Sequence, residues 1–136
     1  MFLLDTDVVS ASRRPEKAGK GLALWVAETS PRSMYLSVVT ILELKIGALR
    51  LYNRDRGRAI ELEEWIRQRV LSRFQGRIFA FDETTASLCA PLHVPKTRPE
   101  RDAMIAATAL QHSLTVVTRN VRDFAPMGVQ FFNPWE

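Results

Sequence analysis

The segment 1–10, MFLLDTDVVS, places two carboxylates directly after a short apolar run. Phe2, Leu3 and Leu4 lead straight into Asp5 and Asp7, and the first Lys or Arg of the chain comes only after this segment. An apolar run of this length predicts a strand that is buried on both faces of a parallel sheet. A carboxylate at the end of such a strand is costly to bury unless it is paired or solvated. Asp5 is therefore the first candidate for a functional residue.

Further strands and helices alternate along the rest of the chain. The predicted strands are 2–4, 34–38, 77–81, 114–118 and 129–132, and the predicted helices are 8–13, 22–30, 41–52, 60–74, 83–90 and 102–112. We expect a loop at 15–21 and a basic loop at 95–99. Alternating strands and helices predict an α/β fold, with a parallel central sheet of about five strands and helices on both faces. Because no repeat, low-complexity tract or linker interrupts this order, residues 1–136 are expected to form a single domain.

The composition excludes several classes of protein. The chain has 136 residues, of which 46% are hydrophobic and 25% are charged, so it can bury a core and is not expected to be disordered. No apolar run is long enough to cross a membrane, and the N-terminus lacks the pattern of a signal peptide. The lone cysteine excludes an internal disulfide. These features predict a cytoplasmic location.

The charge balance leaves two interpretations open. The formal net charge is +4 and the sequence pI is about 9.7, and arginines supply most of the positive charge. A basic surface favours phosphate-rich partners such as nucleic acids. The alternative is a helical surface covered by salt bridges, since Glu61, Glu63 and Glu64 lie among the arginines of the helices predicted at 41–52 and 60–74.

Acidic and amide side chains recur where the predicted strands end. They are Asp5 and Asp7 after the first strand, Glu43 after the second, Asp102 before the fourth, and Asn120 and Asp123 after the fourth. Ligands of a parallel sheet bind outside the carboxyl ends of its strands, so three to five of these side chains would converge at one edge if the first, second and fourth strands are neighbours. Converging carboxylates raise each other's pKa unless a cation neutralises them. Mg²⁺ or Mn²⁺ suits such oxygen ligands, and no His/Cys cluster indicates zinc.

Most of these acids also have a structural interpretation. Asp7 is favoured as the N-cap of the following helix. Glu43 fits a capping box with Thr40, in which the glutamate reaches back to the threonine amide. Asp102 could complement a helix dipole, and Asp123 could cap a turn. Their shared position at strand ends is what favours a functional site.

Four motifs, in order, give the chain a family resemblance: D-T-x-V, T-x-x-E-L, D-x-x-I-A-A-T-A and T-R-N-x-x-D-F, followed by a C-terminal VQFFNPW. Together they resemble the PIN-domain ribonucleases, and more narrowly the VapC- and FitB-like toxins of bacterial type II toxin–antitoxin systems. The resemblance covers nearly the whole chain. It implies a PIN-like fold and Mg²⁺- or Mn²⁺-dependent cleavage of phosphodiester bonds in RNA, either tRNA or rRNA.

The same resemblance implies roles for individual residues. The three acids that match the family's metal ligands are Asp5, Glu43 and Asp102. Thr6 matches a hydroxyl residue that helps to hold the site. The fourth acidic position is open between Asn120, which would lower the charge of the site, and Asp123, which would restore it as a further metal ligand.

The resemblance also implies partners. These are an RNA substrate, a cognate antitoxin of the VapB or FitA type that inserts a segment into the active site, operator DNA bound by the complex, and a second copy of the chain in a homodimer. Arg98, Arg101, Arg119 or Arg122 could steer the RNA backbone.

Two rival functions remain open from the sequence. The pattern D-x-D-x-V after an apolar strand also fits a haloacid-dehalogenase-like phosphatase, with Asp5 as nucleophile. That fold is usually longer and needs a later acidic motif that this chain lacks. The second rival is a non-catalytic PIN-like module that binds RNA or protein, which Asn120 at the fourth position keeps open.

Overall fold

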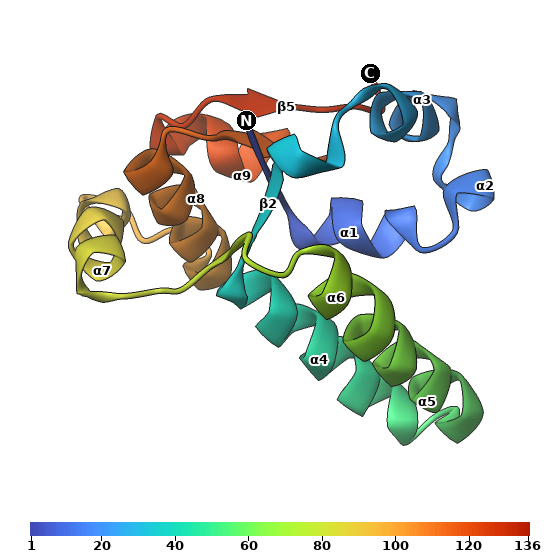
Figure 1. Cartoon of the computed structure of the whole chain (residues 1–136). Coiled ribbons are helices and arrows are strands. Elements are labelled where there is room, and N and C mark those ends of the chain that lie inside the picture. The colour runs from blue at the N-terminus through green and yellow to red at the C-terminus, as the bar shows by residue number, and fades with distance from the viewer.

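The computed structural model describes all 136 residues and contains a five-stranded sheet in the order β3-β2-β1-β4-β5 (Figure 1). The strands are β1 Phe2–Leu4, β2 Met34–Ser37, β3 Ile78–Phe79, β4 Thr115–Val117 and β5 Phe131–Phe132. All four pairings are parallel. The predicted α/β fold is confirmed. Strand β1 has the predicted bounds, whereas β2, β3, β4 and β5 are each shorter than predicted.

The central position of β1 decides where a ligand site can lie. Phe2 pairs with Met34 of β2 on one side and with Thr115 of β4 on the other. From β1, the strands β2 and β3 are added on one side and the strands β4 and β5 on the other. The order of strand addition therefore reverses between β1 and β4. In open parallel sheets this reversal point leaves a crevice at the carboxyl ends of the strands. Asp5 follows β1 at this crevice.

Nine α-helices and several short helical turns surround the sheet. The α-helices are α1 Thr6–Ser12, α2 Pro15–Ala18, α3 Lys20–Glu28, α4 Val38–Tyr52, α5 Arg56–Trp65, α6 Leu71–Arg73, α7 Glu83–Cys89, α8 Glu100–His112 and α9 Val121–Phe124. The turns are η1 Pro31–Ser33, η3 Ala90–His93 and η4 Ala125–Met127, and η2 Ile66–Val70 is a π-helix. The loop predicted at 15–21 is wrong, because Pro15 starts a helix in its first turn, where its missing N–H is not needed. No helix is long and apolar enough to cross a membrane.

Two hydrophobic clusters cover the two faces of the sheet. Leu3 and Leu4 are neighbours in β1, and neighbouring strand residues point to opposite faces. Leu3 packs in one cluster with the small-residue face of α8, including Ala103 and Ala106, and Leu4 packs in the other with α1. This arrangement confirms the prediction of helices on both faces. The alanines of α8 let its backbone lie close to the sheet, which brings the first turn of α8 toward the carboxyl end of β1.

Helices α4 and α5 form a hairpin that projects away from the sheet (Figure 1). Asp55 begins α5, and its side chain accepts a hydrogen bond from the Arg58 N–H at 3.1 Å. The helix therefore starts four residues earlier than predicted. It continues through the π-helical segment and α6, so one helical arm runs from residue 56 to 73. The root of the hairpin lies at the carboxyl end of β2.

The C-terminal segment packs against the start of α3. The Trp135 indole N–H donates to the Ala18 carbonyl at 2.7 Å. Gly21 lies under the carbonyl of Pro134, where there is no space for a side chain. The contact ties the two parts of the chain together beside the β4–β5 edge.

Replacing Gly21 with Ala should lower the free energy of unfolding by about 1–3 kcal/mol, because the added methyl group would collide with the Pro134 carbonyl oxygen. Gly47, inside α4, is the matched control. A Cβ there would meet nothing within 4 Å, so Gly47→Ala should stabilise the protein by about 0.5–1 kcal/mol. Urea denaturation of both variants measures the difference. A Gly21→Ala protein as stable as wild type would contradict the described packing of the C-terminal segment.

Candidate active site

The carboxyl ends of β1 and β4 gather polar side chains from distant parts of the chain. The Asp5 N–H donates to the Val117 carbonyl at 2.9 Å, which extends the contact between the strands. The Asp5 side chain is buried; its Oδ1 accepts from the Thr6 N–H and its Oδ2 from the Thr118 hydroxyl, both at 2.8 Å. Both carboxylate oxygens are therefore held in fixed positions at the edge of the sheet.

Asp5, and not Asp7, is the N-cap of α1, because Asp5 has extended backbone angles and its side chain accepts from the Thr6 N–H. The prediction that Asp7 is the cap is wrong. Asp7 lies inside the first turn, and its Oδ2 accepts from the Arg119 N–H at 3.0 Å. Its Oδ1 is buried and has no hydrogen-bond partner. Asp7 therefore adds an incompletely paired carboxylate close to Asp5.

The Glu43 side chain is hydrogen-bonded to a residue of α1, whereas the sequence suggested a partner in its own helix. The Thr6 hydroxyl donates to Glu43 Oε1 at 2.6 Å, and the hydroxyl oxygens of Thr6 and Thr40 lie 3.2 Å apart. The capping box predicted for Thr40 and Glu43 is wrong, because Ser37 caps α4 and accepts from the Val39 N–H at 3.0 Å. Glu43 thus reaches across to α1 instead of back along its own helix.

One amide joins two further acids. Asn120 Nδ2 donates to Asp123 Oδ2 at 2.7 Å and to Asp102 Oδ2 at 3.4 Å. Asp102 lies in the first turn of α8, where its charge also suits the helix dipole as predicted. The structure thus brings both residues of the open fourth position, Asn120 and Asp123, to Asp102. The amide supplies protons to carboxylates that would otherwise face each other.

Thr118 belongs to this cluster but is absent from the predicted set, although it opens the motif T-R-N-x-x-D-F. Its hydroxyl donates to Asp5 and accepts from the Asn120 N–H at 2.8 Å. It therefore links the Asp5 part of the site to the Asn120 part. The motif itself carried the signal, because a hydroxyl directly after a buried strand needs a partner.

Burial and mutual repulsion disfavour the charged forms of these acids. Burial, followed by the negative charge of Asp7, raises the pKa of Asp5 from 3.8 to about 7. Burial, followed by the charges of Asp123 and Glu43, raises the pKa of Asp102 from 3.8 to about 6. Burial also raises the pKa of Asp7. The site therefore holds more negative charge than its surroundings neutralise.

Few cationic groups offset this charge. The single ion pair of the structure joins Arg101 Nε to Glu43 Oε2 at 3.8 Å. Arg119 lies beside Asp7 and stacks on the Trp135 ring, with its guanidinium carbon 3.9 Å from the ring centre. Of the arginines predicted to steer RNA, these two therefore border the acids. The Arg98 backbone N–H donates to His93 Nδ1 at 3.1 Å, and its side-chain Nε is buried without a hydrogen-bond partner.

The donor set suits a hard divalent cation bound largely through water. No group of three Asp, Glu, His or Cys side chains is arranged to hold a metal ion directly. Mg²⁺ typically keeps several waters and binds only one or two protein carboxylates, so it does not require three converging side chains. The unpartnered Asp7 Oδ1 and the raised pKa values of Asp5 and Asp102 point the same way, because a cation would relieve both.

The chain is similar in sequence to known proteins over its whole length. Residues 2–128 match the family model of the PIN domain. The chain is 39% identical to the toxin FitB of Neisseria gonorrhoeae, over 99% of each chain. It is 32% identical to the VapC ribonuclease Y4jK of Sinorhizobium fredii, over 100% of this chain and 99% of the relative.

The fold of the chain also matches that of solved structures. The fold matches a chain of FitAcB from Neisseria gonorrhoeae with a TM-score of 0.90 and 37% identity, over 100% of this chain and 99% of the other. It matches a chain of FitAB bound to a DNA fragment with a TM-score of 0.88 and 36% identity, over 100% and 96%.

Without divalent ions, the protein should lose stability as the pH rises from 5 to 8. The folded-state pKa of Asp5 lies above its unfolded value, so the folded state binds the extra proton at pH 5 and must release it by pH 8. The effect of Asp5 is on the order of 2 kcal/mol. Urea denaturation in EDTA should show this loss in wild type and a smaller one in Asp5→Asn. Equal losses in both proteins would contradict the raised pKa of Asp5.

Proposed function

The chain belongs to the PIN-domain family, and we propose that it is a metal-dependent endoribonuclease that acts as the toxin of a toxin–antitoxin pair. The observation that carries this proposal is the cluster of Asp5, Glu43 and Asp102, whose charges repel one another at the carboxyl ends of β1, β2 and β4. The similarity to the FitB toxin and to a VapC ribonuclease supports the same activity.

We assign Asp5, Asp102, Glu43 and Asp123 as the residues that would hold Mg²⁺, or Mn²⁺, directly or through water. All four supply oxygen ligands, which both ions prefer. When bound, the ion would neutralise the acids and the scissile phosphate and would lower the pKa of a water. Burial, followed by repulsion from neighbouring acids, raises the pKa of Asp5 and Asp102, and a bound ion would offset both effects.

The remaining side chains position these acids. Thr6 and Thr118 donate their hydroxyl protons to Glu43 and Asp5, and so fix which lone pairs face the crevice. Asn120 holds Asp102 and Asp123 at a set distance without adding charge. Such outer hydrogen bonds orient ligands and tune their basicity.

The reaction assigned to the site is hydrolysis. A water at the crevice attacks the phosphorus in line, and the bond to the 3′-oxygen breaks. The products carry a 5′-phosphate and a 3′-hydroxyl, and the 3′-oxygen takes up a proton as it leaves. Arg101 and Arg119, which border the acids, suit contacts with the non-bridging oxygens.

The toxin role implies partners that the related structures share. FitAB occurs bound to DNA, so we propose a cognate antitoxin of the FitA or VapB type whose complex with this chain binds operator DNA. An antitoxin arginine in the crevice would pair with the acids and block RNA. We also propose a homodimer and a cytoplasmic location, where the RNA substrate, tRNA or rRNA, is found.

The sequence left two alternative functions open. The match to the PIN-domain family model excludes the haloacid-dehalogenase-like phosphatase. The non-catalytic PIN-like module stays as the alternative outcome of the next experiment.

Replacing Asp102 with Asn should reduce RNA cleavage by more than about 100-fold, since loss of an ion ligand exceeds the cost of losing an outer partner. Purified wild type and variant would be incubated with total tRNA or rRNA and Mg²⁺, and the cleaved ends sequenced. Wild type should produce 5′-phosphate ends, and EDTA should stop the reaction. A wild type that binds RNA but never cuts it would establish the binding module instead.

Replacing Thr6 with Val should weaken Mn²⁺ binding by about 10- to 100-fold, because Glu43 loses the hydroxyl that orients it. Thr6→Ser is the matched control, since it keeps the hydroxyl and should bind Mn²⁺ nearly as wild type. Isothermal titration calorimetry measures both affinities independently of cleavage. Equal Mn²⁺ affinities in Thr6→Val and wild type would show that Glu43 takes no part in holding the ion.

A further inference from the structure

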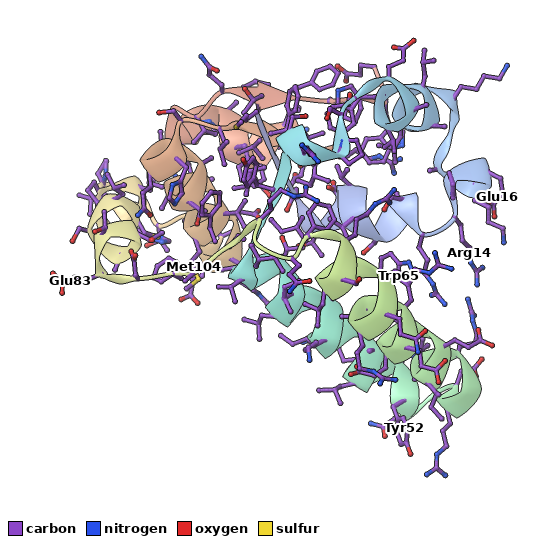
Figure 2. All side chains as sticks on the ribbon, in the orientation of Figure 1. Arg14, Glu16, Tyr52, Trp65, Glu83 and Met104 are labelled. Atoms are coloured by element: carbon purple, nitrogen blue, oxygen red, sulfur yellow. The ribbon has the colours of Figure 1, made fainter.

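The end of the α4–α5 hairpin carries a concentrated positive charge. Residues 50–58 contain four arginines and a single aspartate. We call the arginines the basic tip: Arg50, Arg54, Arg56 and Arg58. All four are exposed. Figure 2 shows Tyr52, which lies among them in sequence, at the end of the hairpin farthest from the sheet.

No acidic group of the protein neutralises the basic tip. The single ion pair of the structure, Arg101 with Glu43, lies elsewhere. Asp55 is occupied as the cap of α5, where it accepts the Arg58 N–H. The salt-bridged helical surface that the sequence left open is therefore wrong, because the glutamates of α5 pair with none of these arginines. The tip presents its charge to solvent, where it attracts phosphate.

An aromatic ring accompanies the arginines. The Arg56 guanidinium carbon lies 5.0 Å from the centre of the Tyr52 ring, and the Tyr52 side chain is 41% exposed. Arginine and an exposed aromatic ring are the groups that bind nucleic-acid backbone and stack on bases. Arginines that served only to keep the protein in solution would not require the Tyr52 ring beside them.

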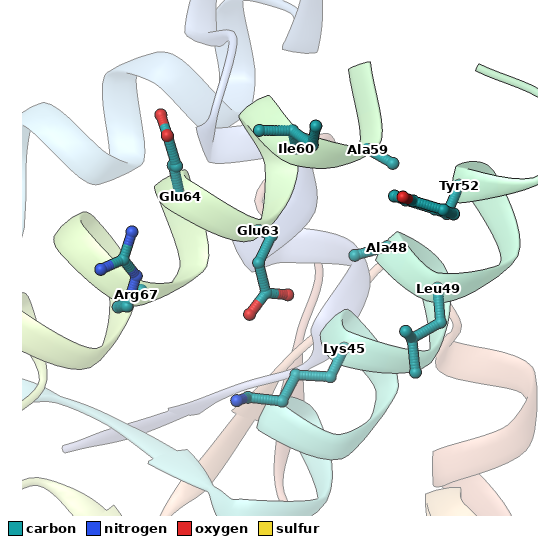
Figure 3. A pocket seen from close by; sticks show the side chains of 9 residues that line it. All are labelled: Lys45, Ala48, Leu49, Tyr52, Ala59, Ile60, Glu63, Glu64 and Arg67. Atoms are coloured by element: carbon teal, nitrogen blue, oxygen red, sulfur yellow. The ribbon is translucent and has the colours of Figure 1, made fainter. Parts of the chain in front are cut away.

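A groove between the two helices adjoins the basic tip. It has a volume of about 530 Å³ and is lined by Lys45, Ala48, Leu49, Tyr52, Ala59, Ile60, Glu63, Glu64 and Arg67 (Figure 3). Its middle is apolar, which suits a base more than a phosphate. Glu63 and Glu64 line it together with Lys45 and Arg67, so the groove has no net formal charge, whereas the basic tip is positive.

The hairpin connects the basic tip rigidly to the acids. Glu43 lies in α4 near the root of the hairpin, and Tyr52 lies nine residues farther along the same helix. At about 1.5 Å per residue, the two are about 14 Å apart along the helix axis. One RNA molecule can therefore reach the acids and the tip together.

We propose that the basic tip is a second RNA-binding surface, which grips the backbone of the substrate at a distance from the cleaved bond. This proposal rests on the proposed ribonuclease function and extends it to substrate choice. RNA long enough to span from the acids to the tip binds more tightly than RNA that fills only the crevice.

The test compares two variants that lose the same charge. The tip variant is Arg54→Gln/Arg56→Gln/Arg58→Gln, which keeps the Arg58 backbone N–H that pairs with Asp55. The control is Lys17→Gln/Lys20→Gln/Arg32→Gln, whose side chains are exposed on α2, α3 and η1. Both are made in the Asp102→Asn background, and binding of a labelled RNA stem–loop is followed by fluorescence anisotropy over a range of salt concentrations.

The tip variant should lose more than about tenfold in affinity, and the slope of log K against log salt should flatten by about 2 to 3 for three lost phosphate contacts. The control should keep both values close to those of the parent. Equal losses in the two variants, or no loss in either, would overturn the proposal. If the tip variant instead turns a dimer into a monomer by light scattering with RNA affinity intact, the tip is a subunit contact and the proposal fails.

Circular dichroism checks that the variants fold, and the single changes Arg54→Gln and Arg58→Gln repeat the test if the triple variant does not. Each single change should flatten the slope by about 0.7 to 0.9. Anisotropy reads binding without cleavage, so this result stands apart from the activity of the wild type. Wild type that binds through the tip but never cuts RNA would remove the proposed catalysis and leave the RNA surface in place.

Discussion

The burial of several carboxylates at one edge of the sheet is the constraint on which the site depends. Asp5 is buried, and its two oxygens are fixed by Thr6 and Thr118. Burial in this fixed position, followed by the negative charge of Asp7, raises its pKa. The same holds, more weakly, for Asp102. A protein that keeps such an arrangement stores a free-energy cost that a divalent cation relieves, and this cost links the fold to the proposed chemistry.

The fold creates this constraint through the order of its strands. Because β1 lies at the centre and β4 beside it, segments more than 110 residues apart in the chain end at the same edge. The alanine face of α8 then places Asp102 near that edge. Hydroxyls and one amide fill the spaces between the acids, so the oxygens keep their positions while the net charge stays negative. The packing of small residues is thus as necessary to the site as the acids themselves.

Arg101 and Arg119 border the acids, and four further arginines gather at the end of the hairpin, away from the acids. Only Arg101 forms an ion pair with a site carboxylate, whereas the four arginines of the basic tip have no acidic partner. Separating the charges in this way leaves the acids free for a cation and the arginines free for phosphate. The stiff helix between Glu43 and Tyr52 sets the distance between the two surfaces.

The sequence by itself determined the α/β class, the approximate strand positions and the identity of the acids, because hydrophobic periodicity and ordered motifs are local properties. It misplaced the cap of α1, the partner of Glu43 and the structure of 15–21, and it left Thr118 out. Those features depend on hydrogen bonds such as Thr6 to Glu43 and Thr118 to Asp5, which join residues 37 and 113 positions apart. Only the tertiary structure could decide them, since capping preferences read from neighbours cannot weigh a competing partner that folding brings from elsewhere.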